Sequence, residues 1–208
     1  MGDSYADRRR SAIEDAAYEV LAEKGYKAAS MLEVAKRAGA SNETLYKWYG
    51  NKQGLFASLV KGNAELVTQR LDDVMASGPG DDPLRHLQIV GEALIEMLTS
   101  ERAIAINRAA AGDVHDTNKL GKALAQAGRD AVLPRISVLL ERAIEQKILR
   151  VASIPQMADV WTSLLIGDKQ IRLVTGQIDC PSAAERTERA TFAVDALRKL
   201  FGRGSDRA

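Results

Sequence analysis

Residues 30–52 read SMLEVAKRAGASNETLYKWYGNK, and their pattern predicts two short helices joined by a tight turn. Ser30 can cap the first helix in a capping box, because Glu33 follows three residues later. Gly39 breaks that helix almost at once, and Ser41 is placed to cap the next one. Two short helices separated by a glycine turn are typical of a helix-turn-helix.

A longer helix is predicted just before this pair. Its apolar residues recur at intervals that place them on one helix face: Ile13, Ala16, Ala17, Val20 and Leu21. Gly25 predicts a left-handed end to that helix. The three helices together predict a helix-turn-helix domain over residues 1–52.

Helical periodicity continues through the rest of the chain. A fourth helix is expected from about Asn51 past Leu71, and a break is expected at residues 77–83, SGPGDDP. Later helices are predicted at 84–99, 101–111, 117–128, 131–147, 155–175 and 181–201. Pro134 falls in the first turn of one of them, where proline is tolerated. The predicted fold class is all-α, with an N-terminal three-helix helix-turn-helix domain followed by a larger helical domain over residues 53–208.

Composition limits the kinds of partner and the compartment. A net charge of +1 does not favour a broad polyanion-binding face, so any nucleic-acid contact must come from local groups such as Arg8, Arg9 and Arg10. A frayed, solvated tail is the other interpretation of these arginines. Cys180 is the single cysteine, which excludes an intrachain disulfide and a multi-cysteine zinc site. No apolar run approaches the roughly 18 residues of a membrane span, and no secretory signal is evident. A cytoplasmic protein without membrane contact is expected.

An enzyme is a further class to consider. The segment GDVHDTNK contains Asp113, His115 and Asp116, which could in principle ligate a metal or act as an acid–base pair. The other histidine, His86, falls on a different predicted helix, and the sequence has no nucleophile motif and no phosphate-binding glycine loop. We therefore expect no catalytic residues, no metal and no cofactor.

Helix geometry sorts the side chains of the second helix of the pair. Leu45 and Tyr49 lie four residues apart and share a face, which we interpret as the inward one. Trp48 lies at the edge. The cap and the remaining side chains are then available to bases and phosphates at the leading end of a recognition helix: Ser41, Asn42, Glu43, Thr44, Tyr46 and Lys47. Lys52, at the start of the next helix, can bring an ammonium and a helix N-terminus toward a phosphate.

In this order and spacing, the chain resembles the N-terminal domain of the TetR family of transcriptional regulators. The matching pieces are Ala16-Ala17, Glu23-Lys24-Gly25-Tyr26, Ser30-x-x-x-Val34-Ala35-x-x-Ala38-Gly39, Ser41-x-x-Thr44-Leu45-Tyr46 and Lys52-x-x-Leu55-Phe56. The resemblance implies that Thr44, Tyr46, Trp48 and Lys52 touch DNA, and that Ser30 can meet a phosphate.

Three positions depart from the family pattern. Tyr49 stands where the family usually has Phe, so its ring is expected in the core with the hydroxyl at the rim. Trp48 stands where Tyr or His is usual, although an indole N–H can still donate to a phosphate. Glu43 is unusual beside a phosphate backbone, and it could accept from a cytosine amino group or be repelled to one side.

The region after the break is similar to the AefR-like subgroup of TetR C-terminal domains. The matching pieces are Leu98-Thr99-Ser100-Glu101, Ala103-Ile104-Ala105-Ile106-Asn107-Arg108, Glu145-Gln146-Lys147-Ile148-Leu149 and Leu164-Leu165-Ile166-Gly167. The resemblance implies that residues 53–208 bind a small apolar or amphipathic effector in a mostly apolar pocket. The candidate effector-binding residues are Arg108, His115, Trp161, Leu165, Asp168 and Gln170. A structural role is the alternative for each, and Arg108 could instead pair with Asp113.

The resemblance also implies a homodimer, formed through a four-helix bundle that takes the last two helices of each subunit. The candidate interface residues are Trp161, Leu164, Phe192, Ala193, Ala196, Leu197 and Leu200. Packing inside the subunit core is the alternative. A dimer would present two recognition helices to a near-palindromic site.

The sequence therefore predicts a ligand-responsive transcriptional regulator of the TetR type, with repression as the family habit. It would bind double-stranded operator DNA as a homodimer and be released by a small-molecule effector. The alternative is a helical small-molecule-binding protein without sequence-specific DNA binding, which the unusual Glu43 supports.

Overall fold

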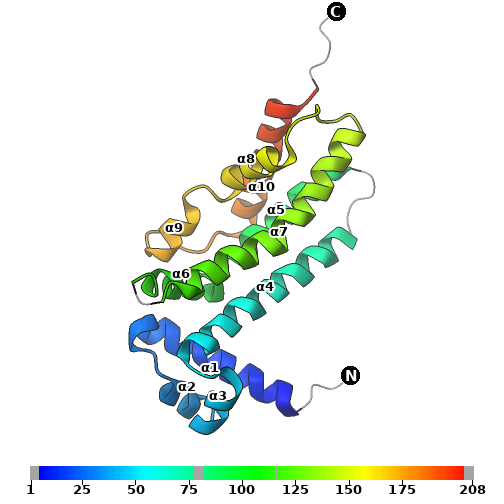
Figure 1. The fold of residues 1–208 in the computed structure, drawn as a ribbon. Coiled ribbons are helices and arrows are strands. Elements are labelled where there is room, and N and C mark those ends of the chain that lie inside the picture. The colour runs from blue at the N-terminus through cyan, green and yellow to red at the C-terminus, as the bar shows by residue number, and fades with distance from the viewer. Residues whose placement is uncertain (1–4, 77–81, 116, 204–208) are drawn as a thin grey trace, which may run out of the picture. The chain divides into compact units, whose positions relative to one another are not determined.

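The computed structural model describes residues 5–76, 82–115 and 117–203, and within them the chain forms ten α-helices (Figure 1). They are α1 (Tyr5–Ala28), α2 (Met31–Arg37), α3 (Asn42–Tyr49), α4 (Lys52–Ala76), α5 (Pro83–Leu98), α6 (Glu101–Gly112), α7 (Lys119–Glu145), α8 (Ile154–Ile166), α9 (Lys169–Val174) and α10 (Ala183–Phe201). The described residues contain no strand, only one antiparallel bridge between Leu149 and Gly202. The predicted all-α fold class is confirmed.

The chain divides into two compact units. The first unit holds residues 1–64 and 101–127, and the second holds residues 65–100 and 128–208. Two long helices, α4 and α7, contribute to both units. The boundary after residue 52 stays a prediction, because it separates a DNA-binding role from other roles rather than one compact unit from another.

The helix-turn-helix lies in the first unit, where α2 packs against both α1 and α3. The Ser30 hydroxyl accepts from the Glu33 amide at 3.2 Å, and the Ser41 hydroxyl accepts from the Thr44 amide at 3.0 Å. Both predicted caps are therefore present. The Glu33 carboxylate contacts Lys24 at 2.7 Å, so it is engaged in an ion pair that the capping box did not predict.

The predicted end of the first helix takes the form of a kink. Gly25 has φ 71° and ψ 170°, and a short helical segment then continues to Ala28. The core of the first unit draws on α1 to α4 and also on α6 and the beginning of α7. Its buried residues include Ile13, Ala17, Val20, Val34, Leu45, Leu55, Leu59, Ile106, Ala109 and Leu120.

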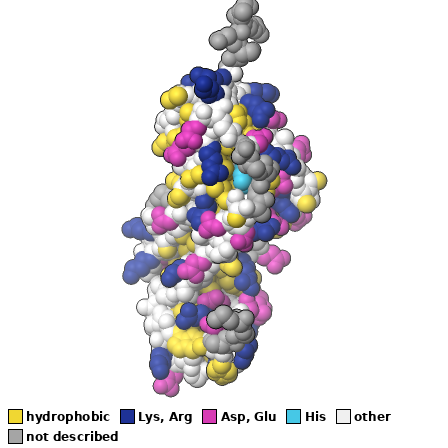
Figure 2. Space-filling model, turned by 90° about the vertical axis from the view of Figure 1, so that its right-hand side faces the viewer, with side chains coloured by type: hydrophobic (Ala, Val, Ile, Leu, Met, Phe, Trp, Pro, Cys, Tyr) yellow, Lys and Arg dark blue, Asp and Glu magenta, His cyan; other side chains and the backbone are white. Residues whose placement is uncertain are grey.

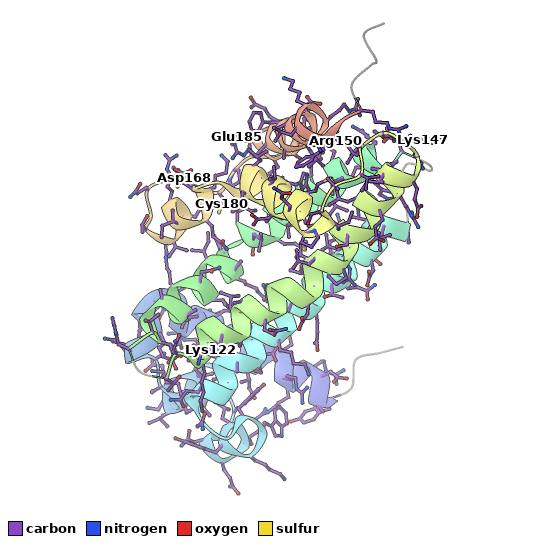
Figure 3. The ribbon with its side chains drawn as sticks, turned by 45° about the horizontal axis from the view of Figure 1, so that its top comes forward. Lys122, Lys147, Arg150, Asp168, Cys180 and Glu185 are labelled. Carbon is purple, nitrogen blue, oxygen red and sulfur yellow. The ribbon has the colours of Figure 1, made fainter. Side chains whose placement is uncertain are left out.

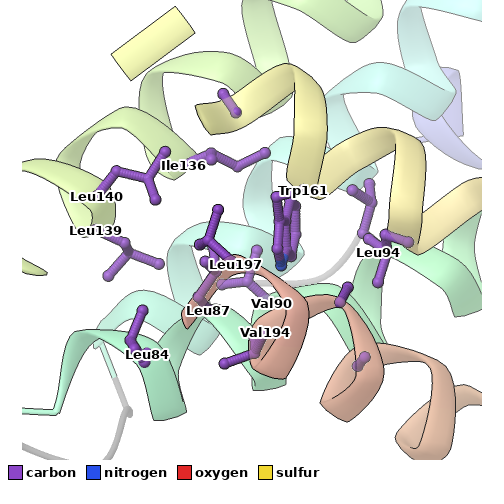
Figure 4. Packing of buried hydrophobic residues seen from close by; sticks show 14 of the residues in the cluster. Leu84, Leu87, Val90, Leu94, Ile136, Leu139, Leu140, Trp161, Val194 and Leu197 are labelled. Carbon is purple, nitrogen blue, oxygen red and sulfur yellow. The ribbon is translucent and has the colours of Figure 1, made fainter. Parts of the chain in front are cut away.

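The core of the second unit is built largely from α5, α8 and α10, which pack on one another. Trp161 is fully buried at its centre, close to Val90, Leu94 and Leu197 (Figure 4). Its ring fits a space that Gly91 leaves open, since a methyl group at Gly91 would lie 3.1 Å from the indole Cζ2. The second unit therefore has its own apolar interior.

One continuous helix, α7, replaces the two helices predicted at 117–128 and 131–147. Pro134 lies inside this helix rather than in a first turn. An interior proline costs about 3 kcal/mol, because it lacks an N–H and crowds the preceding turn. Ile136, Leu139 and Leu140, which follow it, are all buried. The packing of these three residues outweighs the local cost of the proline, and the helix continues.

The helix predicted over residues 155–175 is broken into α8 and α9. Gly167 ends α8 with φ 54° and ψ −136°. The Arg189 side chain of α10 donates from Nε to the Leu165 carbonyl at 3.2 Å. A side chain of another helix therefore donates to a carbonyl that would have accepted from a backbone N–H if the helix had continued.

Among the described helices, none combines the length and the apolar character that a membrane crossing requires. On the face shown in Figure 2, cationic and anionic side chains intermingle, in keeping with the near-neutral net charge.

Candidate nucleic-acid interface

The short helix α3 buries one face and exposes the other. Leu45 is completely buried in the core of the first unit, whereas Tyr46, the next residue, is 50% exposed. Asn42, Glu43 and Lys47 are also exposed. The inward face predicted for Leu45 is confirmed, and it leaves the polar and aromatic side chains of α3 directed away from the core.

The beginning of α3 is organised by the hydroxyls of Ser41 and Thr44. The two oxygens lie 2.8 Å apart, and the Ser41 oxygen also accepts from the Thr44 amide. Thr44 is partly buried as a result of its position beside the cap. The threonine hydroxyl is therefore held at the leading end of the helix, where helix-turn-helix proteins meet DNA. Ser30, at the start of α2, is exposed and holds its own cap.

The two aromatic residues at the end of α3 behave differently. Trp48 is 37% exposed, at the edge of the helix, and its ring meets the ring of Tyr49 edge-on at 6.5 Å between centroids. The Tyr49 hydroxyl is buried and has no hydrogen-bond partner among the described residues. Burial raises the pKa of this hydroxyl to about 12. The hydroxyl is thus not at the rim of the core, which corrects the prediction for Tyr49.

Lys52 lies at the first residue of α4, but its ammonium is directed to protein groups. Nζ donates to the Lys27 carbonyl at 3.2 Å and lies 4.4 Å from the centroid of the Tyr26 ring. The same ring packs edge-on against Phe56 at 5.3 Å. Lys52 therefore joins the beginning of α4 to the end of α1, and a phosphate contact would require its side chain to leave these partners.

The arginines near the N-terminus are helical rather than a frayed tail. Residues 5–10 form the beginning of α1, and Arg9 donates from Nη2 to the Gly39 carbonyl at 3.1 Å. Gly39 lies in the turn between α2 and α3. No local sequence pattern indicates this contact, because it joins residues thirty positions apart.

An ionic cluster fixes α1 against α2 beside the helix-turn-helix. Arg37 makes two contacts to the Glu23 carboxylate, at 2.8 and 2.7 Å, and lies 3.6 Å from Glu19. The hydrogen bonds from Arg37 lower the pKa of Glu23, and those from Lys24 lower the pKa of Glu33. These groups are partly or fully open to solvent, so we expect the cluster to orient the helices more than to stabilise them. The four-residue spacing of Glu33 and Arg37 on one helix is the sequence pattern that could have predicted part of this cluster.

The candidate effector-binding residues do not come together. Trp161 and Leu165 lie one turn apart in the interior of the second unit, and both are fully buried. Arg108 and His115 belong to the first unit and are exposed. Asp168 is exposed at the junction of α8 and α9, 3.9 Å from Arg172 (Figure 3). Trp161 and Leu165 lie in one core, whereas Arg108, His115 and Asp168 do not join them.

A small cavity lies beside Leu165 in the second unit. Its volume is only about 10 Å³, barely room for one water molecule. Its lining residues are Ile95, Leu98, Thr99, Leu165, Ile166, Lys169 and Gln170. Trp161 and Thr162 lie a few residues before Leu165 in α8. The indole N–H of Trp161 and the hydroxyl of Thr162 are buried without a hydrogen-bond partner among the described residues. The interior thus combines an apolar lining with a few polar groups.

The alternative that Arg108 is buried against Asp113 is wrong, because Arg108 is exposed. Asp113 is buried and accepts from Thr117 and from the amides of Lys119 and Leu120, so that it caps α7. Within the described residues no group of three potential metal-ligating side chains occurs. Asp116, considered with this segment, lies outside the described residues.

The candidate interface residues divide between the core and the surface. Trp161, Ala193 and Leu197 are completely buried within the single chain. Leu164 and Ala196 are partly buried, whereas Phe192 is 50% and Leu200 55% exposed. Phe192, Ala196 and Leu200 recur every four residues on α10 and form a stripe along it, which we call the α10 stripe.

Comparisons with known proteins agree with this architecture. The family model described as bacterial regulatory proteins, tetR family, matches residues 13–59. The model described as AefR-like transcriptional repressor, C-terminal domain, matches residues 85–202. The second match alone spans more than half of the chain.

Individual relatives give the same result. The chain is 28% identical over 164 residues to the HTH-type transcriptional repressor KstR of Rhodococcus jostii, covering 76% of this chain and 71% of KstR. It is 49% identical over 143 residues to the uncharacterized HTH-type transcriptional regulator YdeS of Bacillus subtilis, covering 67% and 66% of the two chains.

A solved structure of a TetR-family regulator from Mesorhizobium loti aligns with a TM-score of 0.80. The sequence identity is 22%, and the alignment covers 96% of this chain and 100% of the other, so this likeness shows the fold. Proteins of this kind regulate transcription and are not enzymes. The helix-turn-helix of α2 and α3, together with the two family matches, establishes that this chain belongs to the TetR family of DNA-binding transcriptional regulators.

Proposed function

We propose that this protein is a cytoplasmic, ligand-responsive repressor that binds a near-palindromic operator as a homodimer. A small apolar or amphipathic effector would release it from DNA. Repression is supported by the similarity of the C-terminal region to the AefR-like transcriptional repressors and of the chain to the repressor KstR.

The observation that carries the proposal is the construction of α3. Leu45 anchors the helix in the core, while Tyr46, Lys47 and the capped leading end are left outward. A tyrosine hydroxyl and an ammonium are suited to phosphate oxygens, and the polar groups of the first turn are suited to base edges. A short helix with this division is what insertion into a major groove requires.

Dimerisation is supported by the α10 stripe. Phe192 and Leu200 are large apolar side chains that are half exposed on one face of a helix whose other face is in the core. A second copy of this stripe, related by a twofold axis, would cover both. Because Trp161, Ala193 and Leu197 are buried within the subunit, the proposed contact surface narrows to the α10 stripe and Leu164.

Effector binding is supported by the interior of the second unit. Buried polar groups in an apolar core usually have partners, so the indole N–H of Trp161 is a donor that an acceptor on a bound ligand or water would satisfy. In the proposed mechanism the effector favours a second arrangement of the dimer, which changes the separation of the two α3 helices. The long helix α4 is the proposed link, since it supplies Leu55 and Leu59 to one core and Val67 and Leu71 to the other.

Selection of operator DNA from a random duplex library tests the proposal. The full-length protein should enrich a near-palindromic sequence and bind it at least about a thousandfold more tightly than scrambled duplex at physiological salt. Its non-specific affinity should fall steeply as salt is raised, and a sequence-dependent difference should remain. Equal affinity for selected and scrambled DNA would contradict the proposal.

The same measurement separates the second candidate, a helical binding protein without sequence-specific DNA binding. Glu43, exposed in the first turn of α3, favours it, because a carboxylate beside phosphates is repelled. Under this alternative the library yields no preferred sequence. A preferred sequence with cytosine opposite Glu43 would instead assign the carboxylate to base reading.

A further inference from the structure

The peptide group between Gly39 and Ala40 controls the direction in which α3 leaves the turn. Gly39 has φ 58°, in the left-handed region, where glycine has the most conformational freedom. Ser41 caps α3 two residues later. A rotation about Gly39 would therefore swing the whole recognition helix, and the hydrogen bonds of this peptide group decide how far it can move.

Both polar atoms of that peptide group are held by other helices. The Ala40 amide donates to the Ala35 carbonyl of α2 at 2.9 Å. The Gly39 carbonyl accepts from Arg9 Nη2 of α1 at 3.1 Å. One peptide plane is thus fixed at its N–H by the first helix of the motif and at its C=O by the helix outside it.

Arg9 differs from its neighbours in α1. The first buried residue of this helix is Ile13, and residues 5–12, all of them described, form an extension beyond the core. Within the extension Arg9 alone is partly buried, and the other side chains are exposed. Arg10, the next residue, has an exposed side chain of the same charge. The chain therefore offers its own matched control.

We propose that Arg9 is a positioning residue for DNA reading, which acts by bracing the Gly39 carbonyl and so fixing the orientation of α3. This inference rests on the proposed operator binding. A cation that contacted phosphate alone would strengthen specific and non-specific binding alike, because phosphate contacts carry no sequence information. A contact that holds the turn instead changes the ratio of specific to non-specific affinity, because base contacts depend on the angle of the recognition helix.

The test compares Arg9→Ala, Arg9→Gln and Arg10→Ala in the full chain, using the duplex that the unsubstituted protein selects and a scrambled duplex. Arg9→Ala should lower the ratio of specific to non-specific affinity about fivefold, the equivalent of one lost hydrogen bond. Arg10→Ala removes the same charge and should leave the ratio unchanged. Arg9→Gln also removes the charge, and its amide nitrogen lies two bonds short of the Nη2 atom that reaches Gly39, so it should lower the ratio as Arg9→Ala does.

A measurement without DNA accompanies the binding series. Hydrogen exchange at the Ala40 amide should be faster in Arg9→Ala than in Arg10→Ala, because a loosened peptide plane also loosens the Ala40–Ala35 hydrogen bond. Equal ratios for Arg9→Ala and Arg10→Ala would overturn the inference, as would an unchanged ratio in Arg9→Gln. Failure of the proposed function shows differently, as an absence of any enriched sequence with the unsubstituted protein.

Discussion

Tyr49 holds an unfavourable polar group in the DNA-binding unit. Its hydroxyl is buried without a hydrogen-bond partner among the described residues. Burial is the main cause that raises its pKa to about 12, with the nearby Glu14 charge adding to the rise and Arg10 opposing it. An unpaired buried hydroxyl costs about 1–3 kcal/mol. The ring adds apolar surface to the core, whereas the unpaired hydroxyl is destabilising.

Tyr49→Phe should therefore raise the free energy of unfolding by about 1 kcal/mol, because it removes the unpaired group and keeps the ring. Urea unfolding at pH 7 measures it. Tyr46→Phe is the control, since the Tyr46 side chain is half exposed and its change should stay within about 0.5 kcal/mol. A loss of stability in Tyr49→Phe would mean that the hydroxyl has a bound partner such as water.

Tyr46 is also the residue of α3 on which operator contact can be tested most directly. Tyr46→Ala should weaken operator binding about tenfold, equivalent to about 1.4 kcal/mol, because a hydroxyl and an aromatic surface leave the interface. Gel-shift titration measures the affinity, and sedimentation checks that the dimer is intact. Tyr46→Phe then isolates the hydroxyl. Unchanged affinity in Tyr46→Ala would remove this residue from the interface.

The beginning of α7 depends on one carboxylate. Asp113 accepts from the Thr117 hydroxyl and from the Lys119 and Leu120 amides, between 2.8 and 3.1 Å. Burial works to raise the pKa of Asp113, but these hydrogen bonds outweigh it, and the pKa lies below its ordinary value. A carboxyl whose pKa is lowered by folding stabilises the fold above its unfolded pKa, and this stabilisation is lost as the pH falls through the folded value.

Asp113→Asn should lower the free energy of unfolding at pH 7 by about 1–2 kcal/mol, because an amide replaces the charged cap. The difference from the unsubstituted protein should shrink below about pH 4, near the ordinary pKa of an aspartate. Urea unfolding at a series of pH values measures it. Asp195→Asn, on the exposed side of α10, should show neither effect. A difference that is constant with pH would contradict the role of the charge.

The break between α8 and α9 rests on a glycine and an arginine. Gly167→Ala should destabilise the protein by about 1–3 kcal/mol, because φ is 54° and a methyl group would lie 2.7 Å from Arg189 Nη2. Gly128→Ala, in α7, is the matched control. Nothing lies within 4 Å of the methyl group it adds, so it should stabilise by about 0.5–1 kcal/mol. Thermal unfolding compares the two, and the same sign for both would contradict the assignment.

At the scale of the whole molecule, the proposed dimerisation links operator binding to the response to the effector. Leu200→Asp should convert the proposed dimer to monomer and lower operator affinity, since a charge would be buried in the interface. Sedimentation and gel-shift titration measure the two effects. Val151→Asp introduces the same charge at a site that is 85% exposed and lies outside the α10 stripe, and it should alter neither. A dimer that survives Leu200→Asp with unchanged affinity would move the interface elsewhere.

Much of the DNA-binding unit could be predicted from the residues alone. The Ser30 and Ser41 caps each join atoms three residues apart, and the inward position of Leu45 follows from helical periodicity. The contacts of Arg9 with Gly39 and of Lys52 with Lys27 could not be predicted, because each joins two helices whose packing no local pattern reports. The sequence therefore predicts the helix that carries the candidate site, whereas the contacts that hold this helix in place depend on the tertiary fold.

The amino-acid sequence by itself determined the all-α class and the helix-turn-helix, because caps and periodicity act within a few residues, and its motifs carried the resemblance to the family. Only the tertiary structure decided that α7 continues through Pro134 and that a helix ends at Gly167. It also decided that Trp161 is buried while Phe192 is left at the surface. The physical reason is common to these cases. A proline inside a helix, a positive φ and the unpaired N–H of a buried indole each have a local free-energy cost. Only contacts with other helices can offset that cost.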